Sequence, residues 1–402
     1  MKKKLLYVSP VMSRSGYGDH AREVARFLLT KQTEYDIRLA GTTWGSNPQT
    51  GLEADDALNK ELSSLFLTES DSYDGCDVYI QLGLPPEFKP IGNFNIGITA
   101  GVETDKLGQS FIDGANRMDL IIVPSEFTKQ TFLESVYTNK QHQNIRVTTP
   151  IEVVHEYADP SFYKNTSDAF CIPELDALDE DFCFLYVGQW TSSDADDGGR
   201  KNVNSLINSF VGAFHNQENK PALILKTSGV NFSVSDYIDT QEKIQSILNE
   251  HPNESQPSVY LLHGDFTPSE MFYIYNHPKV KAFATHTRGE GFGRPILEAT
   301  LSGIPVLATK WSGHLDIIDK KHSVLLPGTL KPVGVVSDIF SESSSWMDVD
   351  NQFASDYMKK VVQNYDKYKQ KALKLREINQ EKFNPETIND TYNTALSKHI
   401  PS

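Results

Sequence analysis

Two carboxylates, Glu290 and Glu298, flank a glycine-containing loop in the second half of the chain. We expect a helix to open at Pro295, because a first-turn position needs no backbone N–H, and Glu298 then lies about one turn into it. Glycines at Gly291 and Gly293 would let a phosphate approach the backbone at the helix start, where free N–H groups and the helix dipole favour anions. The carboxylates could accept hydrogen bonds from sugar hydroxyls on either side of that phosphate. From spacing alone, a plain strand–loop–helix connection with solvated glutamates is equally compatible.

The elements around this loop follow in a fixed order. An apolar strand ends at residues 283–284, and the helix is expected to stop at Gly303, a residue that closes helices in the left-handed region. Residues 304–308 form a second apolar run, and residues 311–314 form a second glycine-containing loop. The segment therefore predicts two buried strands with one helix between them.

This segment, GEGFGRPILEA followed by SGIPVLAT and a glycine loop, resembles the carboxylate–x7–carboxylate signature of family 4 retaining GT-B glycosyltransferases. The resemblance extends more weakly over nearly the whole chain. It implies that Glu290 contacts hydroxyls of the donor sugar and that Glu298 contacts the ribose. It also implies that the backbone at the start of the helix holds the phosphates, through Gly291, Phe292, Gly293 and Arg294.

A second candidate region follows the apolar run at residues 182–188. The family places an arginine after this strand and a lysine before the next helix, and the two cations neutralise the diphosphate. Lys201 matches the lysine, with Arg200 beside it, whereas Gln189 stands where the arginine is usual. Arg200 itself, Arg288 or Arg294 could supply the missing charge. The basic pair could also be only a surface salt-bridge cluster with neighbouring aspartates. The turn at Asp265 and Phe266 corresponds to the place where the family holds the base.

The first half begins with an apolar strand at residues 4–10 and a glycine-containing loop at residues 13–18. We expect Asp19 to cap a helix over residues 20–30 and His20 to be a solvated first-turn residue. The resemblance places the loop near the donor phosphates and the acceptor. This makes Gly16 and Gly18 candidate donor contacts.

Another candidate lies at the end of the strand at residues 94–100. Ligands in open α/β sheets bind beyond the carboxyl ends of the strands, which would expose Glu103 and Asp105 to a substrate. The family often carries a sugar-contacting histidine around this place, and here Glu103 is the proposed substitute. Alternatively, both carboxylates cap a helix that starts near Lys106. The predicted catalytic set is therefore Lys201, Glu290 and Glu103.

Strands alternate with helices along the chain, which predicts an α/β protein with doubly wound sheets. The resemblance implies the GT-B fold, with two Rossmann-like domains facing each other across a crevice. We expect an acceptor-binding domain at residues 1–163, a linker at 164–181 and a nucleotide-sugar-binding domain at 182–380. A single long helix is expected at 355–378, and a last helix within residues 381–402, from Pro385, that crosses back to the first domain.

Composition limits the function classes. The formal net charge of −15 disfavours a general surface for nucleic acid or anionic membranes. A hydrophobic content of 39% and a charged content of 23% are typical of soluble globular proteins. No apolar run reaches the roughly 18–20 residues that a transmembrane helix needs, and the chain begins with lysines that lead directly into a strand. We expect a cytoplasmic protein whose three cysteines are free.

These observations predict a retaining glycosyltransferase that moves a sugar from a nucleoside diphosphate sugar, preferably a UDP-sugar, to an acceptor hydroxyl. No metal or other cofactor is expected, since no DxD-like carboxylate pair follows a strand. The acceptor could be a glycan, a lipid-linked sugar, a protein or a modified nucleobase. The alternatives are a GT-B sugar-nucleotide epimerase or phosphorolytic enzyme and, less favoured, a non-catalytic binding module. A dinucleotide oxidoreductase is disfavoured, because SRSGYGDH lacks the G-x-G-x-x-G spacing.

Overall fold

The computed structural model describes residues 2–52, 57–68, 75–163, 172–190, 199–218, 220–229, 231–252, 255–334 and 340–401. The chain folds into two compact units. The first comprises Met1–Glu156, Pro332–Ser345 and Glu386–Ser402, and the second comprises Tyr157–Lys331 and Trp346–Pro385. Residues 157–163, assigned to the first domain from the sequence, thus pack in the second unit, and residues 332–334 and 340–345 pack in the first. Part of the predicted linker, residues 164–171, lies outside the described residues.

The first unit is built on a six-stranded parallel sheet with the order β2-β1-β3-β4-β5-β8. In β1, Leu5 pairs in register with Ile37 on one side and with Val78 on the other. The strands are β1 (Lys3–Ser9), β2 (Tyr35–Gly41), β3 (Val78–Leu82), β4 (Phe94–Ile98), β5 (Leu120–Val123) and β8 (Ile151–Val153).

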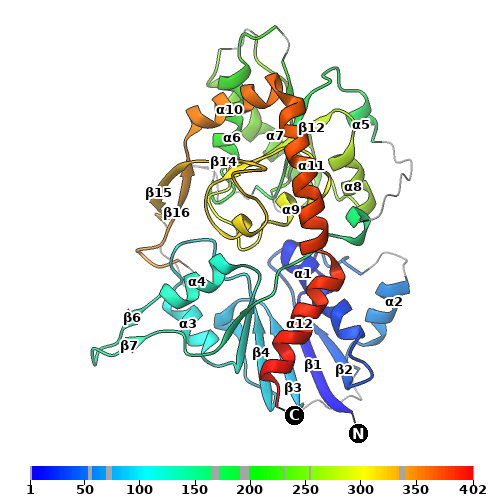
Figure 1. The fold of residues 1–402 in the computed structure, drawn as a ribbon, viewed down its shortest axis with the longest axis vertical. Coiled ribbons are helices and arrows are strands. Elements are labelled where there is room, and N and C mark those ends of the chain that lie inside the picture. Colours follow the sequence, from blue (N-terminus) through cyan, green and yellow to red (C-terminus); the bar gives the residue numbers. More distant parts are fainter. Residues whose placement is uncertain are drawn as a thin grey trace. The chain divides into compact units, whose positions relative to one another are not determined.

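Helices cover this sheet (Figure 1). They are α1 (Gly16–Leu29), α3 (Gln109–Ala115), α4 (Glu126–Glu134) and α12 (Pro385–His399), with α2 (Ala57–Ser64) beside α1. Phe111 of α3 and Phe132 of α4 share one core with Leu6 of β1. On α1, Phe27 stacks on Tyr392 of α12, with ring centroids 5.0 Å apart.

Helix α1 begins earlier than the sequence predicted. Its N-cap is Ser15, whose side chain accepts a hydrogen bond from the Gly18 N–H. Asp19 therefore lies in the first turn, where it pairs with Arg22, and is not the cap. His20 is buried and lies 3.2 Å from the Tyr392 hydroxyl, so the expectation of a solvated histidine was wrong.

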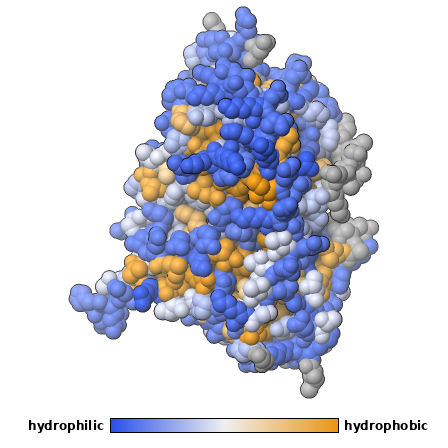
Figure 2. All heavy atoms as spheres, viewed as in Figure 1, coloured by the Kyte–Doolittle hydropathy of each residue, from blue (hydrophilic) through white to orange (hydrophobic). Residues whose placement is uncertain are grey.

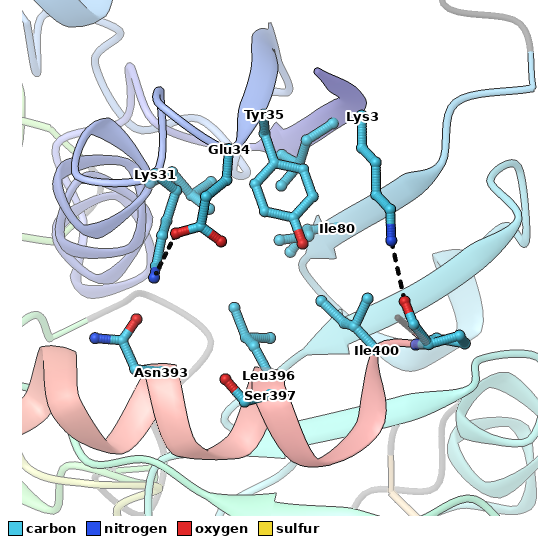
Figure 3. A pocket seen from close by; sticks show the side chains of 12 residues that line it. Lys3, Lys31, Glu34, Tyr35, Ile80, Asn393, Leu396, Ser397 and Ile400 are labelled. Atoms are coloured by element: carbon cyan, nitrogen blue, oxygen red, sulfur yellow. Dashed lines mark hydrogen bonds and ion pairs between the residues drawn. The ribbon is translucent and has the colours of Figure 1, made fainter. Parts of the chain in front are cut away.

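Helix α12 closes the amino-terminal edge of this sheet and leaves a cavity there (Figure 3). The cavity has a volume of about 180 Å³. Its apolar lining includes Leu5, Leu28 and Ile80, and α12 contributes Asn393 and Leu396. The Asn393 Oδ1 atom is buried and has no hydrogen-bond partner.

The second unit is built on another six-stranded parallel sheet, with the order β11-β10-β9-β12-β13-β14. The strands are β9 (Cys183–Val187), β10 (Ala222–Lys226), β11 (Val259–Leu262), β12 (Val280–Ala284), β13 (Val306–Thr309) and β14 (Val324–Leu326). The helices are α6 (Val203–Phe214), α7 (Val234–Asn249), α8 (Pro268–Asn276), α9 (Arg294–Leu301), α10 (Asn351–Gln363) and α11 (Tyr365–Lys382). Side chains alternate across the strands, so Phe184 packs in a core with α6, α7 and α10, whereas Leu185 packs in a core with α8, α9 and α11.

The single helix predicted at residues 355–378 is two helices. The chain bends at Asn364, which has φ −125° and ψ 37°. The break is required because α10 packs on α6 and α11 packs on α9, in the two different cores.

A two-stranded sheet, β15 (Gly328–Pro332) and β16 (Ser345–Val349), carries the chain out of the second unit and back. Within the first unit, the Asp105 carboxylate accepts a hydrogen bond from the Ser345 N–H at 2.6 Å. Asp105 therefore does not cap the helix that follows, α3, whose N-cap is Gly108.

The molecular face drawn in Figure 2 is largely hydrophilic, with apolar patches between the hydrophilic regions. None of the helices in the described part of the chain has the length and apolar character that a membrane span requires. Cys76 and Cys183 are buried free thiols.

Candidate active site

The sheet topology of the second unit identifies the place where a ligand would bind. From β9 the chain proceeds outward to β10 and β11, and β12 then returns to the opposite side of β9. The carboxyl ends of β9 and β12 therefore form a topological switch point, the usual ligand site of open α/β sheets. The loop before α6 brings Lys201 to this point, and the loop after β12 brings Glu290.

Glu290 is held there by three donors. Lys201 Nζ lies 2.6 Å from Glu290 Oε1, Arg200 Nη1 lies 3.1 Å from Oε2, and the Thr287 hydroxyl donates to Oε1 at 2.7 Å. The Glu290 side chain is 12% exposed. Burial alone would raise the pKa of its carboxyl, but the Lys201 and Arg200 charges and the hydrogen bonds outweigh burial and lower that pKa to about 2. Glu290 is therefore an ionised, acceptor-only group beside two cations.

The loop after β13 fixes the backbone of Glu290. The Glu290 N–H donates to Ser312 Oγ at 2.9 Å, and the Gly313 N–H donates to the Glu290 carbonyl at 2.9 Å. His314 Nε2 lies 2.6 Å from the Thr309 carbonyl, which can only accept, so this nitrogen carries the proton. Burial lowers the pKa of His314, and its neutral ring can accept from the Ser312 hydroxyl. The sequence showed this loop only as a glycine turn and did not single out Ser312 or His314.

The start of α9 lies beside this carboxylate. Gly293 is the N-cap, with φ +100°, and no side chain caps the helix. A Cβ at Gly293 would lie 2.9 Å from His314 Cβ, so backbone conformation and space both require glycine. Pro295 occupies the first turn as predicted. An uncapped helix start with close backbone access is suited to an anion.

Glu298 lies in α9, four residues after Arg294 and half-buried. Burial, together with the Glu298 carboxylate, raises the pKa of the Tyr275 hydroxyl, which donates to the Pro295 carbonyl at 3.2 Å. Glu298 thus sits one turn below the helix start, where the sequence predicted it.

The other predicted donor contacts are distributed around the same edge of the second sheet. Gln189 is exposed directly after β9, and Phe266 follows β11 with its ring centroid 5.3 Å from Lys226 Nζ. Phe292 is buried edge-to-face against Phe383, so its side chain packs in the core. Arg294 Nη1 donates to the Tyr157 carbonyl.

Gly16, Gly18 and Glu103 belong to the first unit. Gly16 is exposed with open space around it, whereas a Cβ at Gly18 would lie 1.9 Å from the Ser13 carbonyl oxygen. Gly18 therefore has a packing reason to be glycine. Glu103 is half-buried. The pKa of the Tyr17 hydroxyl is raised mainly by the burial of Tyr17, and the negative charge of Glu103 raises it further. Asp105 contacts Ser345, as described above.

Among the residues that the structure describes, no group of three or more histidine, cysteine, aspartate or glutamate side chains could hold a metal ion.

Comparison with known proteins relates part of this chain to a glycosyltransferase family and its fold to known structures. Residues 279–390, which include Glu290, α9 and Glu298, match the model described as "Family 4 Glycosyltransferase in conflict systems". Similar solved structures include HepE from Anabaena in complex with UDP and glucose (14% identity, TM-score 0.57, 98% of this chain and 100% of that chain). The chain has the GT-B fold of glycosyltransferases.

Two further structures share the GT-B fold. One is sucrose-phosphate synthase from Thermosynechococcus elongatus, with 13% identity, a TM-score of 0.64 and 99% of each chain covered. The other is a UDP-forming trehalose-phosphate synthase from Burkholderia xenovorans, with 9% identity, a TM-score of 0.64 and 100% of each chain covered. No match was found among curated proteins. The α/β class and the GT-B resemblance predicted from the sequence are confirmed.

Proposed function

We propose that the protein is a retaining glycosyltransferase that transfers a sugar from a nucleoside diphosphate sugar, with UDP as the preferred nucleotide, to an acceptor hydroxyl. The observation that carries the proposal is the Lys201–Glu290 ion pair at the β9/β12 switch point, beside the uncapped start of α9. The UDP and UDP-glucose complexes of HepE support the choice of nucleotide.

In this proposal the diphosphate lies over the start of α9, and Lys201 and Arg200 turn from Glu290 to the phosphate oxygens. The Glu290 carboxylate, which can accept several hydrogen bonds, then accepts them from hydroxyls of the donor sugar. The Glu298 carboxylate accepts hydrogen bonds from the ribose hydroxyls. Fixed cations and helix-end N–H groups stabilise the charge that develops on the leaving diphosphate. The leaving phosphate itself accepts the proton of the acceptor hydroxyl, so the protein needs no general base and no metal ion.

The roles in the first unit follow from the same proposal. The first unit would bind the acceptor, with Glu103 as an additional sugar contact and Gly16 as a point of close backbone approach. The acceptor is a glycan, a lipid-linked sugar, a protein or a modified nucleobase.

Binding of nucleotide sugars tests the proposal directly. In a thermal-shift screen of UDP-, GDP-, ADP- and TDP-sugars, at least one donor should raise the melting temperature by mass action. Glu298→Ala should weaken nucleotide binding, and Lys201→Ala should reduce turnover, while Lys310→Ala, at an exposed lysine of the same unit, should change neither. Absence of binding by every donor would remove the proposal.

Product analysis separates the alternatives. With donor alone, a transferase gives slow hydrolysis at most, an epimerase changes the sugar, and a phosphorolytic enzyme consumes the donor only with added phosphate. Binding without any turnover would favour a non-catalytic module.

A further inference from the structure

Arg288 lies two residues before Glu290, yet its guanidinium is committed elsewhere. Arg288 Nε donates to Asp348 Oδ1 at 2.8 Å, and Nη1 donates to the Gly199 carbonyl at 3.0 Å. The guanidinium carbon also lies 5.2 Å from the ring centroid of Trp346. The side chain is 7% exposed. Among the arginines that could replace the missing cation at Gln189, Arg200 pairs with Glu290, whereas Arg288 is held by the half-buried Asp348 carboxylate.

The backbone of Arg288 joins the same two segments as its side chain. The Arg288 N–H donates to the Arg200 carbonyl at 2.8 Å, and the Arg288 carbonyl accepts from the Met347 N–H at 3.0 Å. One residue therefore ties the loop that carries Lys201 to strand β16.

Asp348 holds that loop from the other side of Lys201. Its Oδ1 accepts from Asn202 Nδ2 at 3.3 Å, and its Oδ2 accepts from Lys331. Asn202 is the N-cap of α6, in the left-handed conformation with φ 50°. Burial alone would raise the pKa of Asp348, but hydrogen bonds and charges from Lys331 and Arg288 lower it, so the carboxylate is ionised. The residues on both sides of Lys201 are therefore held by hydrogen bonds. Gly199 and Arg200, which precede it, bond to Arg288, and Asn202, which follows it, bonds to Asp348.

We propose that Arg288 and Asp348 are positioning residues. They hold the backbone of residues 199–202 so that the Lys201 ammonium forms its ion pair with Glu290. A lysine side chain is flexible and presents a point charge, so the site of that charge depends on how well the backbone around it is fixed. Asp348 also binds the Arg288 guanidinium, so that the Glu290 carboxylate pairs with Lys201 and Arg200 and not with Arg288. The catalytic consequence rests on the proposed function. The positioning itself does not.

Amide hydrogen exchange and steady-state kinetics on the full chain test this together. In Asp348→Asn, the amides of Arg288 and Met347 should exchange at least about tenfold faster, while amides in β10 should be unchanged. Turnover should fall by about 10- to 100-fold, because displacement of a catalytic group by about 1 Å can cost that much, and the donor KM should stay within about threefold.

Two further variants make the result specific. Arg288→Lys keeps a charge for Asp348 but loses the second bond to Gly199, so it should be intermediate in both exchange and turnover. Lys331→Ala removes an exposed partner of the same carboxylate and should behave as wild type.

The outcomes are distinguishable. Wild-type exchange rates in Asp348→Asn would overturn the inference, and so would faster exchange with unchanged turnover in an active enzyme, since a purely structural pair would do that. If the wild type binds no nucleotide sugar, the proposed function fails, and the exchange rates alone decide the positioning.

Discussion

Glu290 is a carboxylate that is nearly buried and yet ionised, because two cations lie within hydrogen-bonding distance of its oxygens. Taking three charges out of water is costly unless each is paired. Removal of one partner therefore leaves an uncompensated buried charge. The resulting loss of stability is larger than the net stabilisation that the intact pair provides.

The stability of the second unit should depend on pH through Glu290. Its folded pKa of about 2 lies below the ordinary value of 4.5, so its contribution is complete above about pH 4.5 and is lost as the pH falls toward 2. One pKa unit corresponds to about 1.4 kcal/mol, which puts the contribution at roughly 3 kcal/mol. Urea unfolding of wild type and Glu290→Gln from pH 7 to pH 3 measures it.

In that experiment the variant should be less stable at pH 7, and the difference should shrink as the pH falls. Two curves that stay parallel over the whole range would show that the Glu290 pKa is not depressed in the folded state.

Single residues were predicted from the sequence by type and place, but their partners were not. Lys201 and Glu290 were both selected, and the ion pair between them, 89 residues apart, was not. Arg288 was a candidate phosphate contact, whereas the structure turns it to Asp348, 60 residues later. Such pairings depend on which loops the sheet order brings together, and periodicity within a loop carries no information on that.

At the scale of elements, apolar runs located most of the parallel strands, because strands buried on both faces are continuously apolar. The runs at residues 4–10 and 182–188 correspond to β1 (Lys3–Ser9) and β9 (Cys183–Val187), whereas the run at 304–308 begins two residues before β13 and β14 was not predicted. Helix starts were harder. In α4 the N-cap is Ser125, a residue type that favours this position. In α1, two glycines in the first turn were interpreted as loop. One of them, Gly18, is required because a Cβ there would lie against the Ser13 carbonyl oxygen, a local contact that depends on how the loop turns into the helix. The bend at Asn364 was missed because both flanking helices are amphipathic and only their packing on different cores separates them.

Helix α12 places an unpaired buried polar atom at the cavity, and its cost to stability can be measured. The Asn393 Oδ1 atom has no partner there, and an unpaired buried acceptor costs about 1–3 kcal/mol. Asn393→Leu places an apolar side chain in the lining of this cavity, which also includes Leu5, Leu28 and Ile80. It should raise the free energy of unfolding of the first unit by about 1 kcal/mol, measured by urea titration.

Thr394→Leu on the same helix is the matched control, since Thr394 is exposed and the gain in helix propensity is similar. Equal stabilisation by the two substitutions would mean that helix propensity, and not the cavity, is responsible.

At the scale of the whole molecule, the chain passes between its two units four times, at Glu156, Lys331, Ser345 and Pro385. Each unit has its own six-stranded sheet, and the second has a core on each face of its sheet. The last segment nevertheless belongs to the first unit, where α12 supplies Tyr392 to stack on Phe27. We therefore expect each unit to unfold cooperatively as a whole, including segments that are far apart in the sequence.

Deletion of residues 386–402 tests this. Ile388 and Tyr392 are buried in the first unit, and at about 2 kcal/mol for each buried side chain their loss alone should destabilise that unit by roughly 4 kcal/mol. Hydrogen exchange should then show faster exchange throughout β1, β3, β4 and β5. Strands β9, β10, β12 and β13 should keep their protection, because no residue of the second sheet or its two cores is removed. Equal loss of protection in both sheets would show instead that the two units unfold as one cooperative block.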